Sequence, residues 1–158
     1  MYPWIVLLHV VGAFLFVMAH GISMLVAFRL RTEADRGRIA ALLALSGEAV
    51  GIMYIGLALL VIGGVWAGFA GDHWGRLWIW TALAILVVIT VVMYVVATPF
   101  YGRMRAAAGV SDTGANLTPP AQESDLAALA TSSRPIWLAA VGGIGLLVIL
   151  WLMIVKPF

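Results

Sequence analysis

Four long apolar stretches divide this chain, and polar segments separate them. The stretches run from about residue 3 to 28, 39 to 69, 77 to 100 and 135 to 155. Each is long enough to supply the roughly 20 residues with which a helix crosses the hydrocarbon of a bilayer, whereas a membrane strand needs only about 9 to 11 residues and alternates in polarity. The pattern therefore predicts an all-α fold, a four-helix transmembrane bundle.

The one long polar segment lies between the third and fourth stretches, from about residue 106 to 133. It is rich in Ala, Ser, Thr, Gly and Pro, which is typical of a flexible linker. Residues 122 to 130 begin with acidic side chains and place Leu126 and Leu129 on one side, which indicates a short surface helix. We therefore expect a single membrane domain, residues 1 to 158, that carries this linker.

The placement of basic residues predicts how the bundle is oriented. Arg76 and Lys156 lie on one side of the expected membrane, and seven arginines lie on the other, in the first and third connections. These seven are Arg29, Arg31, Arg36, Arg38, Arg103, Arg105 and Arg134. Because basic residues stay on the cytoplasmic side, we expect a cytoplasmic linker and both termini on the outer, periplasmic or extracellular, side.

Composition supports a membrane protein and restricts its partners. The chain is 64% hydrophobic and 10% charged, with a mean hydropathy of +1.09, whereas a soluble domain carries roughly 25% charged residues. The pI of 9.4 comes with a net charge of only +2, and the basic residues flank the spans, which favours anionic lipid headgroups and no nucleic acid as partner. The chain has no cysteine, so any metal must bind His, Met or carboxylate groups.

Glu48 is the most unusual residue of the four stretches, because an ionisable group within a bilayer is costly. At a rise of about 1.5 Å per residue, Glu48 lies about 13 Å from the membrane boundary near Ile39. His20 lies about 12 Å from the same boundary near Phe28. The two side chains are therefore expected in one layer of the bundle.

A polar stripe on the third stretch reaches the same layer. Thr90, Tyr94, Thr98 and Tyr101 follow spacings of four, four and three residues, which place them on one helix face. We expect a buried cluster of His20, Glu48, Thr90 and Tyr94, with Ser23 at its edge. Hydrogen bonds between helices explain the hydroxyl groups, but burying an acid costs far more, which favours a ligand-linked role for Glu48.

The histidines indicate a cofactor without specifying it. His9 and His20 lie within about 20° of one helix face and about 16 Å apart, so together they cannot clamp one haem. Haem ligation requires His20 with Met53 or Met93, or histidines from two protomers. The candidate cofactor-binding residues, for haem b or a quinone, are His20, Glu48, Tyr94, Thr90 and His9. Copper(I) is a second metal option because Met24 follows His20 by one helical turn, although methionines also serve as apolar filler.

Glycine spacing predicts where helices approach closely. Gly47-x-x-x-Gly51 and Gly64-x-x-x-Gly68 lie on the second stretch, and small residues at this spacing let membrane helices pack backbone to backbone. Gly47 and Gly51 flank Glu48, so a neighbouring helix is expected to shield that carboxylate from lipid.

A run near the start resembles a known group of proteins. Leu7-Leu8-His9-Val10-Val11-Gly12-Ala13, then His20-Gly21 and an arginine-rich turn, is similar to a bacterial family of predicted four-helix integral membrane proteins of unknown function. That family is distantly similar to the copper-resistance D type of membrane protein. The resemblance covers roughly the first three stretches and implies a bacterial plasma membrane, but it transfers no catalytic residue.

The sequence favours an accessory or scaffold subunit of a larger membrane complex, which binds other membrane subunits or further copies of itself. The alternative is a haem- or quinone-binding redox subunit, and the second alternative is a small proton-coupled or copper transporter. No catalytic residue or reaction follows from these residues, which favours a protein that is not an enzyme.

Overall fold

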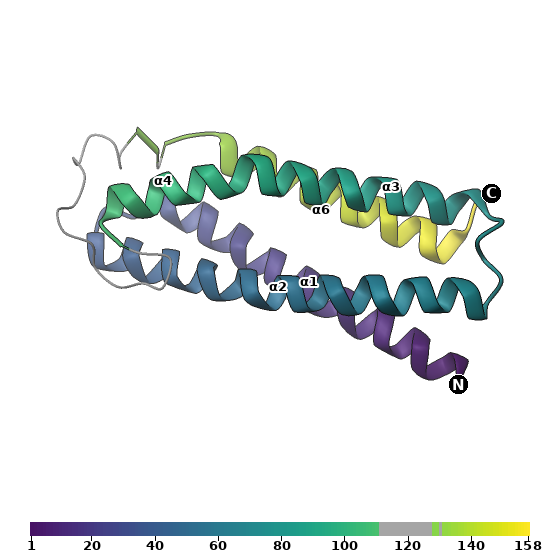
Figure 1. Ribbon diagram of the computed structural model, residues 1–158. Coiled ribbons are helices and arrows are strands. Elements are labelled where there is room, and N and C mark those ends of the chain that lie inside the picture. Colours follow the sequence, from purple (N-terminus) through teal and green to yellow (C-terminus); the bar gives the residue numbers. More distant parts are fainter. Residues whose placement is uncertain (111–127, 130) are drawn as a thin grey trace.

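The structure, a computed structural model, describes residues 1–110, 128–129 and 131–158. Four helical stretches in these residues are long and apolar enough to cross a membrane (Figure 1). They comprise α1 (Tyr2–Leu30), α2 (Arg36–Ala70), the stretch from Leu77 to Ala108 and α6 (Arg134–Val155). The predicted all-helical architecture with four spans is therefore confirmed, whereas the side that the termini face stays a prediction.

The third stretch consists of three helical segments. It begins as α3 (Leu77–Val92), passes through one π-helical segment, η1 (Met93–Ala97), and continues as α4 (Thr98–Ala108). Pro99 has no N–H group for the carbonyl four residues earlier, and the wider π turns lie over the residues that precede it. The stretch ends at Gly109, whose φ of 74° is the left-handed conformation that stops many helices.

The third stretch ends later than the sequence predicts. The third stretch continues to Ala108 rather than ending near residue 100, so the first residues of the expected linker are helical. The short helix expected at 122–130 lies outside the described residues, apart from residues 128 and 129. At the other connection, Asp35 caps α2 by accepting a hydrogen bond from the backbone N–H of Arg38 at 2.8 Å.

Helices α1 and α2 pack backbone to backbone through glycines. A Cβ atom added at Gly56 would lie 2.6 Å from the backbone nitrogen of Phe16, and one at Gly63 would lie 2.7 Å from that of His9. Gly51, by contrast, has nothing within 4 Å of such an atom. The close approach of α1 therefore uses Gly56 and Gly63, and not Gly51, one of the two glycines that flank Glu48.

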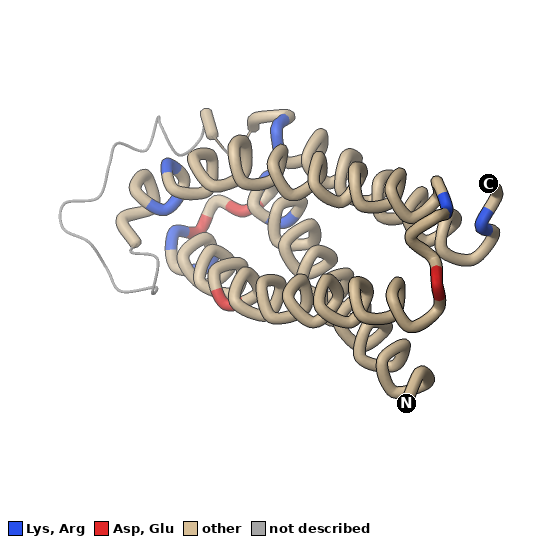
Figure 2. Tube along the Cα trace, turned by 45° about the vertical axis from the view of Figure 1, so that its right-hand side comes forward, with Lys and Arg blue, Asp and Glu red and all other residues tan. Residues whose placement is uncertain are grey.

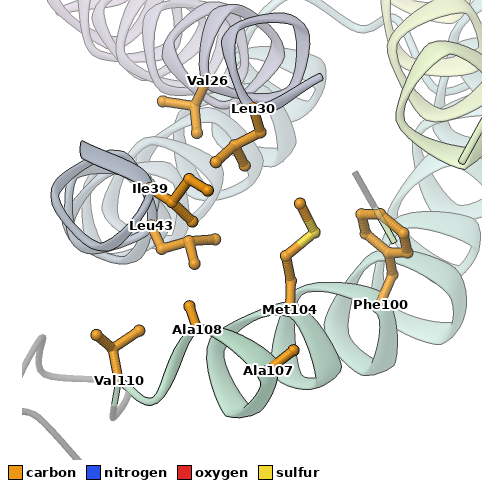
Figure 3. Close-up of a cluster of buried hydrophobic side chains, with 9 residues drawn as sticks. All are labelled: Val26, Leu30, Ile39, Leu43, Phe100, Met104, Ala107, Ala108 and Val110. Atoms are coloured by element: carbon orange, nitrogen blue, oxygen red, sulfur yellow. The ribbon is translucent and has the colours of Figure 1, made fainter. Parts of the chain in front are cut away.

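Helices α3 and α6 form the second pair. Near the chain's C-terminus, Trp78, Ile79, Ala82 and Leu152 form a buried cluster between them. At the opposite end of the bundle, α4 packs against α1 and α2 through a larger buried cluster (Figure 3). This cluster consists of Val26, Leu30, Ile39, Leu43, Phe100, Met104, Ala107, Ala108 and Val110. Charged residues gather towards the two ends of the bundle (Figure 2). A cavity lies between the two helix pairs.

Candidate functional site

A cavity of about 560 Å³ lies between the two helix pairs. All four spans contribute to its wall, which is mostly apolar. Its polar lining residues include His20, Ser23, Ser46, Thr90, Tyr94 and Tyr101. Cavities of about 300–1,000 Å³ with a few polar groups on apolar walls are typical of small-molecule sites.

His20 forms part of the cavity wall on α1. Its Nε2 atom is buried and has no hydrogen-bond partner among the described residues. Gly142 of α6 lies against the ring, because a Cβ atom there would overlap the Cε1 and Nε2 atoms of His20. The same Cβ atom would lie 2.8 Å from the methyl carbon of Met93, so the His20 ring and the Met93 side chain lie close together. A buried polar nitrogen without a partner is costly, which points to a ligand.

Two residues of the third stretch bring hydroxyl groups to the same cavity. Thr90 donates its hydroxyl proton to the backbone carbonyl of Leu86 at 2.8 Å, so that donor is already used within α3. Tyr94 belongs to the π segment and is 66% exposed. Its hydroxyl makes no hydrogen bond to another residue in the described part of the chain. The structure therefore brings His20, Ser23, Thr90 and Tyr94 to one cavity, although Tyr94 is exposed rather than buried as expected.

Glu48 does not join this group. It is exposed and does not line the cavity. The lining residues of α2 include Ser46, Val50, Met53 and Leu57, which share one helix face. At 100° per residue, Glu48 points about 180° away from the centre of that face. The direction around the helix separates its side chain from His20, so the expected pairing of Glu48 with His20 is wrong.

His9 also lies outside the cavity. Its Nδ1 atom is 2.7 Å from the backbone carbonyl oxygen of Leu60 on α2. Because a carbonyl only accepts, Nδ1 carries the proton and donates it. The ring lies directly over Gly64, where a Cβ atom would be 2.9 Å from its Nδ1 atom. His9 thus joins α1 to α2, and its hydrogen-bonding requirement is met by that contact.

Sequence reasoning did not select two residues that shape the cavity, Tyr54 and Gly142. Tyr54 lines the cavity and is 53% exposed. Its spacing of eight from Ser46 and four from Val50 is the helical pattern that could have identified it. No sequence pattern distinguishes Gly142 from the other glycines of α6, because its importance comes from the His20 ring on another helix.

Soft potential ligands lie beside His20. Met24, Met53 and Met93 all line the same cavity. No group of three or more His, Cys, Asp or Glu side chains placed to hold a metal occurs in residues 1–110, 128–129 and 131–158. The donor set at this cavity is therefore one imidazole with thioethers and hydroxyls.

The fold and this cavity define a four-span integral membrane protein with an intramembrane pocket. Residues 3–157 match the family described as "Predicted integral membrane protein (DUF2269)". The chain belongs to this family, and it therefore sits in a lipid bilayer. No curated protein and no solved structure matches the chain.

Proposed function

We propose that this protein is a membrane subunit that binds a planar redox cofactor, haem b or a quinone, in the cavity beside His20. The single observation that carries this proposal is the buried Nε2 atom of His20, which has no hydrogen-bond partner in the described part of the chain. An imidazole nitrogen ligates haem iron through its lone pair, and its protonated form donates to a quinone carbonyl. Either ligand satisfies this atom.

The remaining lining supports a flat, mostly apolar ligand. Met24, Met53 and Met93 present polarisable thioethers, which pack favourably against ring systems. Met93 lies next to the His20 ring, and its thioether would be a second iron ligand if haem were bound there. Tyr54 and Tyr94 offer hydroxyl groups to the carbonyl oxygens of a quinone.

A role within a larger complex is the second part of the proposal, and Glu48 supports it. Its carboxylate is exposed on the side of α2 opposite the cavity, next to the uncovered Gly51. A charged group exposed to hydrocarbon is costly, and another subunit or a second copy of the chain packed on this face would shield it. Cross-linking in native membranes from position 48, followed by identification of the joined protein, tests this role; only lipid adducts would contradict it.

The resemblance of the first three stretches to a bacterial family supports a bacterial plasma membrane, and the distribution of arginines supports a topology in which both termini face outward. Because the chain has no cysteine, a Pro157→Cys variant carries one reactive thiol. A membrane-impermeant maleimide should label this variant in intact cells. Labelling that requires broken cells would reverse the proposed orientation.

An absorption spectrum and a solvent extract of the detergent-purified protein test cofactor binding. We expect either a Soret band or a stoichiometric quinone in the wild-type protein. The His20→Leu variant should lose it, whereas His9→Gln, which is altered outside the cavity, should keep it. A folded wild-type protein that is colourless and quinone-free would contradict the proposal.

A further inference from the structure

The edge of α2 beside the cavity points away from α1. Gly56 faces α1, because a Cβ atom there would lie 2.6 Å from the backbone nitrogen of Phe16. Tyr54 precedes Gly56 by two residues, which is a rotation of about 200° around the helix axis, so its side chain points away from α1. Tyr54 lines the cavity and is 53% exposed. It therefore marks the edge of the cavity that is farthest from α1.

The edge of α3 has a corresponding arrangement. Ile89 faces α6, because a Cβ atom at Gly145 would overlap its Cδ1 atom. Val91 follows Ile89 by two residues, which is a rotation of about 200° around the helix axis, so its side chain points away from α6. Val91 lines the cavity and is 53% exposed. The cavity is thus bordered by two exposed edges, one on α2 and one on α3.

Helix α2 and the third stretch are in contact at both ends of this opening. At one end, the ring of Trp74 in the α2–α3 connection packs on Phe69 at 5.3 Å between centroids, and the backbone carbonyl of Trp74 accepts a 2.9 Å hydrogen bond from the indole N–H of Trp80. At the other end, α4 packs on α2 through Leu43 and Met104 (Figure 3). Between these contacts the backbones of α2 and α3 do not approach each other closely. The opening therefore faces the side of the bundle, where the bilayer lies.

We infer that this opening is a lateral mouth through which a quinone with an apolar tail passes between the bilayer and the cavity. The inference rests on the proposed function and narrows it from two cofactors to the quinone. The ring lies at His20, and the tail leaves between Tyr54 and Val91 into the lipid. Tyr54 and Val91, which border the mouth, are uncharged, and the cationic side chain among the lining residues, Arg105, lies on α4 at one end of the cavity. The carboxylates of haem would therefore lose their hydration in the mouth without a counter-charge there.

The hydroxyls at the mouth fit the passage of such a ring. Tyr54 and Tyr94 make no hydrogen bond to another described residue. Polar groups in hydrocarbon are costly when they lack a partner, and phenols donate to carbonyl oxygens such as those of a quinone. The two tyrosines therefore offer the ring successive partners on its way to His20.

Closing the mouth reversibly tests the inference. The chain has no cysteine, so a bifunctional thiosulfonate can join only the two thiols of a Leu57→Cys/Val91→Cys variant, which lie on the α2 and α3 walls of the cavity. In nanodiscs supplied with radiolabelled decylubiquinone, the linked protein should take up the quinone about tenfold more slowly or worse, as gated sites do. Reduction of the linker should restore the rate. Equal rates for the linked and reduced protein would overturn the inference.

A bulky substitution provides an independent test. Val91→Trp should narrow the mouth and slow quinone uptake. Val88→Trp is the matched control, because Val88 is 59% exposed on the same helix and does not line the cavity. Equal uptake by the two variants would overturn the lateral mouth.

The outcomes separate this inference from the proposed function. A wild-type protein that holds haem, or a Leu57→Cys/Val91→Cys variant that takes up quinone equally fast when linked and when reduced, overturns the mouth alone. A wild-type protein that binds neither haem nor decylubiquinone overturns both proposals.

Discussion

Replacing Gly56 by alanine should separate α1 from α2. The added Cβ atom would lie 2.6 Å from the backbone nitrogen of Phe16, 3.0 Å from the Cβ atom of Leu15 and 3.1 Å from the carbonyl oxygen of Gly12. Ordinary van der Waals contact begins near 3.4 Å, so the backbones must move apart by up to about 0.8 Å, enough to lose a quarter to a half of the dispersion energy of displaced contacts. We expect the free energy of unfolding to fall by about 2 kcal/mol, within the usual range for overpacking.

Gly51→Ala is the matched control on the same helix. Nothing lies within 4 Å of the Cβ atom that it adds. Alanine is the better helix former by roughly 0.5–1 kcal/mol, so this variant should be as stable as the wild type or slightly more stable. Unfolding in mixed micelles by added SDS, followed by tryptophan fluorescence, measures both free energies. Equal losses for Gly56→Ala and Gly51→Ala, or no loss for Gly56→Ala, would refute the close packing of α1 on α2.

Three further substitutions separate packing from ligand binding. His9→Leu removes a hydrogen bond across the α1–α2 contact and should lower the unfolding free energy by about 1 kcal/mol in the same SDS assay, with the cofactor content of the refolded protein unchanged. Glu48→Gln should leave cofactor content unchanged in the absorption spectrum and extract, because the carboxylate points away from the cavity; a loss would place Glu48 in the site. Gly142→Ala puts a methyl group onto the His20 ring and should weaken ligand binding about tenfold or more in a titration, as displaced active-site groups do, whereas Gly143→Ala, with nothing within 4 Å, should bind normally.

The layer of each polar group could be predicted from the sequence, but its direction could not. The rise per residue places His20, Thr90 and Tyr94 at matching depths, and the structure brings them to one cavity. The same rise places Glu48 at a similar depth, but in the structure its side chain is exposed on the opposite side of α2. Lipid is as apolar as the bundle interior, so apolar residues surround α2 on all sides and do not reveal its inner face.

The contacting glycines and the end of the third stretch were hidden for related reasons. Local spacing singles out Gly47 and Gly51, but the nearest backbone of α1 lies against Gly56. Which glycine is used depends on where the partner helix crosses, which is a property of both helices. From the sequence, Arg103 and Arg105 are expected at the edge of the hydrocarbon, yet the helix continues past them. A helix does not end where it leaves the bilayer, and this one ends at Gly109, which adopts the left-handed conformation.

The mass of the intact protein, released from its native membrane without denaturation, tests the role of His20 most directly. Wild-type protein should carry the additional mass of a haem or a quinone, and His20→Leu protein prepared in parallel should have the mass of the chain alone. Wild-type and His20→Leu proteins that both have the mass of the bare chain would contradict cofactor binding at this cavity.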